Sequence, residues 1–389
     1  MNQLFIIGTL IIIALYSGRL FNKFKFPIVT GYILIGFIIG NVSFFAITTS
    51  SYIKNISFYV NTVALSIILF ELGTEFTIDI LRNMQKKVII VAVLQSTITF
   101  VMIFFTFSFL LNITLPISAL IATIGIATAP DITLLTIRET GRRNSFTKFL
   151  EDIVTIDDLI AEMVFFILFP IVRNYLLHTD NPVHVILFSI KEIIISIILG
   201  ILLGLLLSIF SSEFKRRIPA FAGTVGFLCA AIGISILLNS HTIIVLLVTG
   251  MIFATTTKNK SAVLNVTRQI DSIIFILFLI VNGFALSFNL IKSVLIPSGL
   301  LFIISRGIGK ISGGIAGNFI ARMDKKQAIP LGISILPQST ISIYFAAHSK
   351  GLLLNSGEKI FAITMSGVIF FEIIGAPLLK WSISKIKEE

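Results

Sequence analysis

Cysteine and charge are scarce in this sequence. The 389 residues include one cysteine, Cys229, so neither an internal disulfide nor a cysteine metal cluster can form. Charged residues make up 13% of the chain, about half the share of a soluble domain, whereas 56% of the residues are hydrophobic. The sequence has no glycine-rich phosphate loop and no nucleotide fingerprint. We therefore expect no nucleotide, no cofactor and no direct use of ATP.

Long apolar runs are what the sequence has instead. Runs of about 20 apolar residues recur along its whole length, as a hydrocarbon layer roughly 30 Å thick requires of each helix. We expect an all-α membrane protein in the lipid bilayer with about 13 helices, the N-terminal one being a retained span rather than a signal peptide. Proline, glycine and charge delimit the expected spans: 3–20, 27–45, 55–76, 88–111, 116–137, 151–176, 184–211, 218–238, 240–257, 269–288, 291–320, 327–349 and 359–382.

Basic residues are distributed unevenly between the two sets of loops. The net charge is +11, and 22 of the 30 basic residues fall on one side against 6 on the other. The richer loops lie around 19–25, 82–87, 138–148, 215–217, 258–268, 322–326 and 380–387. The positive-inside rule then puts the N-terminus outside and the C-terminus in the cytoplasm of an inner-membrane, multi-pass protein. This placement explains the positive charge without a nucleic-acid partner.

Three acidic residues lie deep within the sixth expected span, beyond Glu151 and Asp152 at its start. Asp157 and Asp158 are consecutive, so their side chains diverge by roughly 100° on a helix, and Glu162 lies one turn beyond Asp158. An ionisable group in the bilayer core costs at least about 2.5 kcal/mol and marks a functional site by default. A cation, or a proton in its absence, would neutralise the acid that has no fixed partner.

Two basic residues remain inside the membrane, on the eleventh span. Arg306 and Lys310 are four residues apart and share a helical face. A buried ammonium needs a carboxylate partner, which Asp157 or Asp158 can supply. Such a pair could also serve only to hold two helices together, although two adjacent acids exceed what that role requires.

Two spans are interrupted by proline. The fifth carries Pro130 followed by Asp131, and the twelfth carries Pro337 followed by Gln338. Proline removes a backbone donor and frees carbonyl groups at that depth, which is tolerated where the break lines a cavity. Paired breaks of this kind mark binding sites near the membrane midplane. Asp131 could complement the amide ends of a half-helix or form a further ion or proton site.

These motifs together resemble the monovalent cation:proton antiporter-2 family, which includes bacterial Na⁺/H⁺ antiporters. The resemblance rests on the Thr-Ala-Pro-Asp break, the Asp157–Asp158 pair, the Gly-Lys310 helix and the second proline break. It implies the Na⁺/H⁺ antiporter fold: thirteen helices, inverted repeats, two broken and crossing helices, and a homodimer. By position, residues 1–78 and 216–290 would form the dimerisation domain, 178–215 a linker helix, and 79–177 and 291–389 the transport core.

The resemblance also implies roles for single residues. Asp158 matches the principal ion-binding and proton-carrying aspartate, Asp157 the aspartate that pairs with the core lysine Lys310, and Thr128 the polar residue of the first break. Paired aspartates in this family go with exchange of two protons for one Na⁺. This sequence departs from the family pattern at Asp131.

Arg306 is a second departure, because it adds a cation one turn from Lys310. Either departure could shift the pH dependence or the ion preference.

We therefore expect a secondary active transporter, not an enzyme, that exchanges Na⁺ (or Li⁺ or K⁺) for protons by alternating access at Asp157 and Asp158. Its role would be sodium and pH homeostasis. The absence of a cytosolic nucleotide-binding domain, common in the family's K⁺-efflux members, favours Na⁺. K⁺/H⁺ exchange and sodium-coupled symport of an organic solute are alternatives. An intramembrane aspartyl protease would need a Gly-x-Gly-Asp motif that is not present, and an ion channel would not explain the acid–lysine arrangement.

Overall fold

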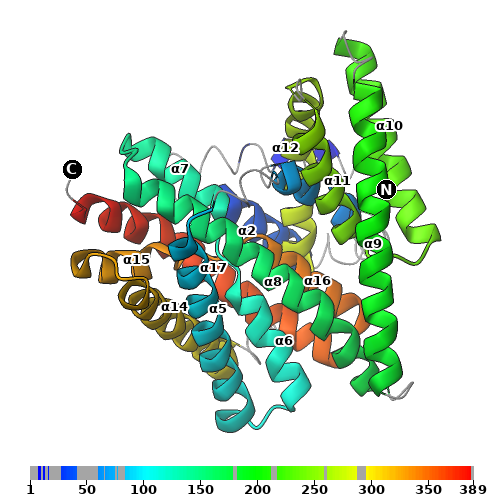
Figure 1. Ribbon diagram of the computed structural model, residues 1–389. Coiled ribbons are helices and arrows are strands. Elements are labelled where there is room, and N and C mark those ends of the chain that lie inside the picture. The colour runs from blue at the N-terminus through cyan, green and yellow to red at the C-terminus, as the bar shows by residue number, and fades with distance from the viewer. Residues whose placement is uncertain are drawn as a thin grey trace. The chain divides into compact units, whose positions relative to one another are not determined.

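The structure is a computed structural model that is helical almost throughout (Figure 1). It describes residues 8–9, 12–13, 16, 28–41, 60–64, 66–74, 77, 84–177, 182–211, 217–257, 261–286 and 295–386. Within these ranges there is no β-strand, only one isolated bridge. The chain divides into two compact units, the first of residues 1–20, 31–83 and 186–285, and the second of residues 21–30, 84–185 and 286–389.

The second unit repeats one order of elements: a long helix, a broken helix and another long helix. The first copy consists of α5 (Lys86–Phe105, extended by the π-helical turn η1, Thr106–Leu110), α6 (Leu115–Ile126), α7 (Pro130–Thr140) and α8 (Ser145–Leu177). The second consists of η2 (Leu295–Gly299), α14 (Leu300–Ile320), η3 (Lys325–Gln327), α15 (Ala328–Ser334), α16 (Ile341–Leu352) and α17 (Leu354–Lys385).

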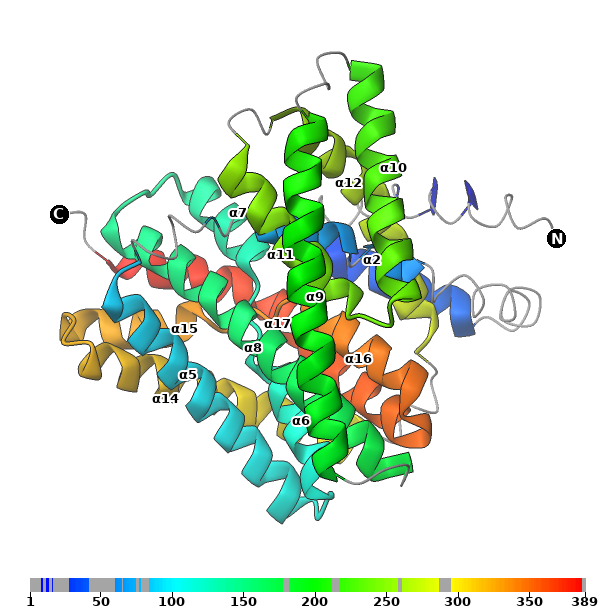
Figure 2. The same ribbon diagram turned by 45° about the vertical axis from the view of Figure 1, so that its right-hand side comes forward.

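A row of glycines brings α14 against α5, and Figure 2 shows the two helices side by side. A Cβ atom on Gly309, Gly313 or Gly317 would lie 2.8, 2.7 or 3.1 Å from the Cα atom of a residue on α5. Glycines four residues apart on one helical face allow this close approach of backbones. The contact places Lys310 of α14 beside the polar residues of α5.

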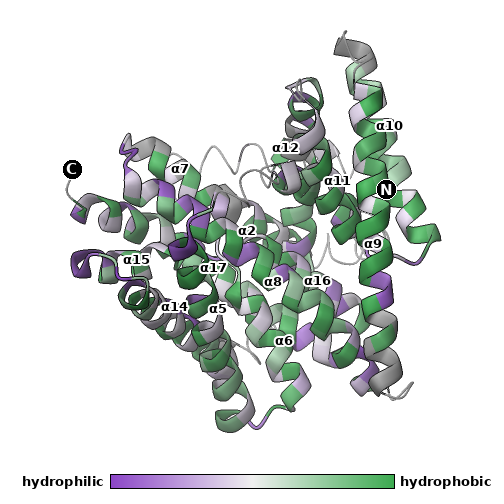
Figure 3. Ribbon diagram, in the orientation of Figure 1, coloured by the Kyte–Doolittle hydropathy of each residue, from purple (hydrophilic) through white to green (hydrophobic). Residues whose placement is uncertain are grey.

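The first unit contains most of α2 (Ile28–Asn41) and α9 (Pro182–Ser211), together with α10 (Arg217–Leu237), α11 (Thr242–Thr256) and α12 (Ser261–Phe284). Its core includes Phe70, Leu207 and Phe253, all fully buried. Helix α9 is hydrophobic along most of its length (Figure 3). It also exposes large side chains, including Ile194 and Leu202. Exposed aliphatic side chains along a helix of this length suit contact with lipid tails.

The expected spans are matched in part. By length and composition, five described helices could cross a membrane, and several shorter apolar helices accompany them. The expected spans 218–238 and 240–257 correspond to the separate helices α10 and α11. Much of spans 3–20 and 55–76, and residues 287–294, lie outside the described ranges, so the number thirteen stays a prediction.

Three helices begin clearly earlier than the expected spans. Helix α12 begins at Ser261 instead of 269, α8 at Ser145 instead of 151, and α17 at Leu354 instead of 359. The start of α8 is fixed by Asn144 and Thr147, each of which accepts a 2.9 Å hydrogen bond from the other's backbone N–H. This reciprocal cap extends the helix through polar residues that had suggested a loop. Asp157 therefore lies more than three turns inside α8.

Candidate cation and proton site

Two broken helices cross at the centre of the second unit. Helix α6 ends at Ile126 and α7 begins at Pro130, while α15 ends at Ser334 and α16 begins at Ile341. The extended segments between them, residues 127–129 and 335–340, are called the crossing below. Thr128 and Gln338 form an antiparallel bridge there. The predicted breaks at Pro130 and Pro337 are thus confirmed.

Two backbone hydrogen bonds hold the crossing together. The Ala129 N–H donates to the carbonyl oxygen of Pro337 at 3.1 Å, and the Ser339 N–H donates to that of Ala127 at 3.4 Å. A helix that stops within a membrane leaves carbonyl and amide groups that no water can satisfy. Pairing the two breaks with each other satisfies part of this need.

Arg306 donates hydrogen bonds to carbonyl oxygens at both breaks. Its guanidinium is fully buried and donates to the carbonyl oxygens of Gly125 at 2.9 Å, Ala127 at 2.9 Å, Leu336 at 2.6 Å and Pro337 at 3.4 Å. These oxygens come from both breaks, so one side chain joins the ends of α6 and α15.

Asp157 is enclosed by four donors. One carboxylate oxygen accepts from Ser96 Oγ at 2.6 Å and from Gln95 Nε2, and the other accepts from Lys310 Nζ at 2.7 Å and from Thr128 Oγ1. An ionised carboxylate offers about four lone-pair sites, and all four are taken. With both side chains of the ion pair fully buried, Asp157 and Lys310 neutralise each other where lipid and protein screen little.

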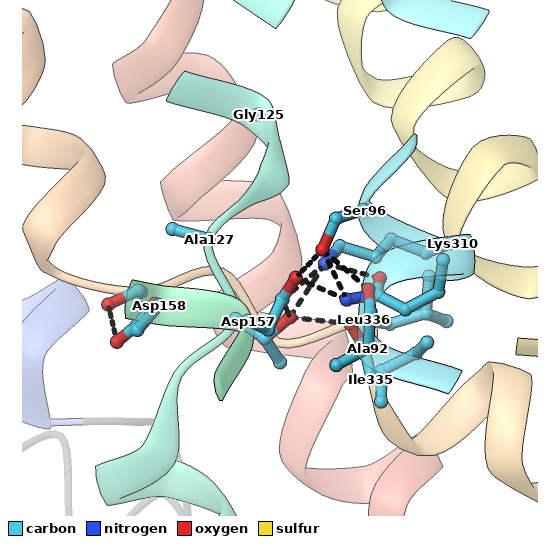
Figure 4. A network of polar contacts seen from close by, with 12 residues as sticks. Ala92, Ser96, Gly125, Ala127, Asp157, Asp158, Lys310, Ile335 and Leu336 are labelled. Atoms are coloured by element: carbon cyan, nitrogen blue, oxygen red, sulfur yellow. Dashed lines mark hydrogen bonds and ion pairs between the residues drawn. The ribbon is translucent and has the colours of Figure 1, made fainter. Parts of the chain in front are cut away.

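Lys310 belongs to the same closed network. Its ammonium also donates to Gln95 Oε1 at 2.9 Å and to Thr128 Oγ1 at 2.7 Å. Each of the three donors of the ammonium therefore has an acceptor. In Figure 4 the Asp157 side chain points into this network, toward Lys310 and Ser96.

Asp158 points away from that network (Figure 4). It is fully buried, and its carboxylate accepts a hydrogen bond from Ser339 Oγ at 3.1 Å. Ser339 belongs to the crossing, so the second aspartate also contacts a broken helix, but on a different side of α8. The two carboxylates thus have different surroundings, as their adjacent positions on a helix require.

Three other predicted site residues lie near these groups in the sequence. Glu162 of α8 is 1% exposed, and its Oε1 atom has no hydrogen-bond partner within the described residues. Gln338 is fully buried, and neither polar atom of its side chain has a partner in that same part of the chain. Asp131 is the second residue of α7, and its side chain lies outside the description.

Three residues of this site were not predicted as site residues from the sequence. Gln95 and Ser96 contact Asp157, and Ser339 contacts Asp158. The available signals were a polar pair in the otherwise apolar helix α5 and the Ser-Thr that follows Gln338 at the second break.

The chain is similar to known transporters over nearly its whole length. It matches the family described as sodium/hydrogen exchanger, transmembrane, over residues 8–381. The ammonium/H⁺ antiporter subunit AmhT of Alkalihalophilus pseudofirmus is 21% identical over 376 residues, which cover 95% of this chain and 93% of that protein.

Solved structures show the same fold. The sodium proton antiporter MjNhaP1 of Methanocaldococcus jannaschii at pH 8 superposes with a TM-score of 0.80 at 16% identity, covering 100% of this chain and 99% of that one. A second structure of MjNhaP1, from electron microscopy, gives a TM-score of 0.76 at 16% identity and covers 99% of each chain. The family and the fold are those of a multi-pass membrane transporter rather than an enzyme. The chain belongs to the sodium/hydrogen exchanger family of monovalent cation:proton antiporters.

Proposed function

We propose that this antiporter exchanges a monovalent cation, with Na⁺ preferred, for protons at Asp158. The observation that carries the proposal is the unequal surroundings of the two aspartates. Asp157 has a buried lysine and three neutral donors, whereas Asp158 accepts a hydrogen bond from a neutral serine of the second break, Ser339. A fully buried carboxylate that contacts a broken helix suits a ligand that comes and goes.

Electrostatics makes the exchange obligatory in this scheme. An ionised carboxylate buried in the membrane is unstable unless a counter-ion or a proton neutralises it. Na⁺ and H⁺ can each neutralise Asp158, but not both at once. Binding of the cation therefore releases the proton, and return of the proton releases the cation.

Movement is also required. Asp158 is fully buried in this structure, so exchange needs a conformational change that exposes it to one side of the membrane and then to the other. Alternating access of this kind commonly moves one bundle of helices against another. We assign the moving transport core to residues 79–177 and 291–389, the linker helix to residues 178–215, and dimerisation to residues 1–78 and 216–290.

Asp157 and Lys310 would stay paired with each other while Asp158 exchanges its ligand. The four donors leave no free lone pair on Asp157, so it could bind a cation or proton only after Lys310 has released it. Thr128 contacts both groups and would guide such a partner swap. A second proton per cycle, as in exchange of two protons for one Na⁺, would require this step.

Other cations remain open to test. The relative from Alkalihalophilus pseudofirmus is named an ammonium/H⁺ antiporter subunit. Ammonium, Li⁺ and K⁺ all carry one positive charge and could occupy a carboxylate site. Sodium-coupled symport of an organic solute is the alternative in which protons play no part.

The surroundings of the protein are part of the proposal. We place the chain in an inner membrane, with the N-terminus outside and the C-terminus in the cytoplasm, on the loop-charge asymmetry. The homodimer is proposed on the family resemblance alone. Its role there would be sodium and pH homeostasis.

Everted vesicles offer the direct test. A respiration-driven pH gradient quenches a weak-base fluorescent dye, and addition of Na⁺, Li⁺, K⁺ or NH₄⁺ should restore the fluorescence, with Na⁺ effective at the lowest concentration. Vesicles from cells carrying the empty vector provide the control. If none of the four cations restores fluorescence above that control, the proposal is wrong; a stronger response to K⁺ or NH₄⁺ would reassign the cation.

A further inference from the structure

Backbone carbonyls at broken helices are the usual ligands of a transported cation. Half-helices in transporters end in unwound segments whose carbonyl oxygens coordinate Na⁺. Each such end also carries partial negative charge from the helix dipole. In this protein, the ends of α6 and α15 meet at the crossing, so their carbonyls would be expected to take part.

Here, however, those oxygens already accept hydrogen bonds from the protein. Arg306 donates to four of them, two from each break, and two of these four also accept the backbone bonds of the crossing. A fifth, the Ile124 oxygen within the last turn of α6, accepts from Ser342 Oγ at 3.0 Å.

Arginine is suited to this arrangement because its planar guanidinium presents five donors in a rigid fork and stays charged. Its Nε, Nη1 and Nη2 atoms all donate here, and the ring of Phe371 lies 4.4 Å from the guanidinium carbon. A lysine at this position would bring a single nitrogen with three donors, too few for four carbonyl oxygens. Lys310, one turn away, has a different partner in Asp157.

We propose that Arg306 is a positioning residue that occupies the carbonyls of Gly125, Ala127, Leu336 and Pro337, so that the transported cation is bound chiefly by the side chains of Asp158 and Ser339 and not by these four backbone oxygens. The inference rests on the proposed exchange function. It gives Arg306 a part in ion preference, because a carboxylate and a hydroxyl bind cations differently from a ring of carbonyl oxygens. Loss of the guanidinium would free carbonyls that attract larger or less strongly hydrated cations.

The test compares Arg306→Lys and Arg306→Gln with Ser312→Ala. Ser312 lies on the same helix, and its hydroxyl bonds only to carbonyls of that helix. Two quantities are measured: the ratio of K⁺- to Na⁺-driven fluorescence recovery in everted vesicles, and the melting temperature of the purified protein without added cation. We expect both arginine variants to melt lower and to change the ratio by about tenfold, equal to ~1.4 kcal/mol between the two ions. Ser312→Ala should match the wild type in both.

The outcomes separate the inference from the proposed function. An unchanged ratio in both variants overturns the inference even if the melting temperature falls, because Arg306 would then only stabilise the fold. If Arg306→Gln fails to reach the membrane, Arg306→Lys decides alone, since it keeps the charge and loses the fork. If the wild-type protein responds to no cation, the proposed function is contradicted instead. If both arginine variants then melt at the wild-type temperature, the role of Arg306 at the crossing is contradicted as well.

Discussion

At the scale of single residues, the two adjacent aspartates have opposite kinds of neighbour. Asp157 has a buried lysine and three neutral donors, which fix its charge. Asp158 contacts a serine of the second break. Because neighbouring residues on a helix diverge by roughly 100°, one pair of identical side chains serves two helix interfaces. This separation allows one acid to anchor the fold while the other exchanges its ligand.

The central residue prediction concerns Asp158. Asp158→Asn should abolish cation-driven fluorescence recovery in everted vesicles, because the neutral amide needs neither a cation nor a proton. Asp152→Asn is the matched control on the same helix and should keep wild-type recovery, since Asp152 is partly exposed and takes no part in the site. Full activity of Asp158→Asn would show that the ligand binds elsewhere.

The ion pair of Lys310 with Asp157 predicts an effect on thermal stability. Removing one partner of a buried pair leaves an uncompensated charge, at a cost of roughly 3–5 kcal/mol. Lys310→Met and Asp157→Asn should therefore each lower the melting temperature. The double variant should melt higher than Lys310→Met alone, because no carboxylate is then left unpaired. Additive losses in this double-mutant cycle would argue that the two groups do not depend on each other.

At the scale of helices, the close packing of α5 and α14 positions the Lys310 network. Gly313 meets Gln95, the residue that bonds both Asp157 and Lys310, and a Cβ atom there would lie 2.7 Å from the Gln95 Cα atom. A methyl group at this point must push the two backbones apart. The site thus depends on a glycine that has no chemistry of its own.

Alanine substitutions on α14 test this packing. Gly313→Ala should lower both the melting temperature and the exchange rate. Gly307→Ala is the matched control on the same helix, because its Cβ would meet nothing closer than 3.9 Å, from Phe371. That variant should be neutral or gain about 0.5–1 kcal/mol from the removal of a helical glycine. Equal effects of the two variants would contradict the packing account.

The elements differ in how far the sequence predicted them. The two breaks follow directly from Pro130 and Pro337, because proline cannot continue a helix at those points. The pairing of Lys310 with an aspartate follows from the cost of a lone buried charge, but this argument does not choose between the two aspartates, and only the family resemblance indicated Asp157. The choice of Asp157 depends on the rotation of α8 against α5, which is set by tertiary packing. The start of α8 was missed because Asn144 and Thr147 form a cap in a polar stretch.

Arg306 shows the same limit more clearly. Its position one turn from Lys310 predicted a shared helical face, and the suggested effect of the second cation was a shift in pH dependence or ion preference. In the structure, Arg306 instead donates to four backbone carbonyls. Two belong to the first break, 179 and 181 residues before Arg306 in the chain, and two belong to the second break, 30 and 31 residues after it. Contacts with backbone atoms leave no pattern in side-chain identity, so a single sequence could not reveal them.

At the scale of the whole molecule, the loop charges predict how the chain lies in the membrane. The positive-inside rule assigns the C-terminus to the cytoplasm because the basic loops outnumber the opposite ones so strongly. A fluorescent protein fused to the C-terminus, which matures only in the cytoplasm, should fluoresce. Alkaline phosphatase at the same position should be inactive. The reverse pattern would invert the proposed topology.

Competition between a proton and a cation for one carboxylate is the claim on which the transport account depends. It is tested most directly by adding Na⁺ to purified protein in detergent, in weakly buffered solution with a pH indicator. The wild type should release protons in a saturable manner that Asp152→Asn retains and Asp158→Asn loses. Proton release that is undiminished in Asp158→Asn would contradict the account.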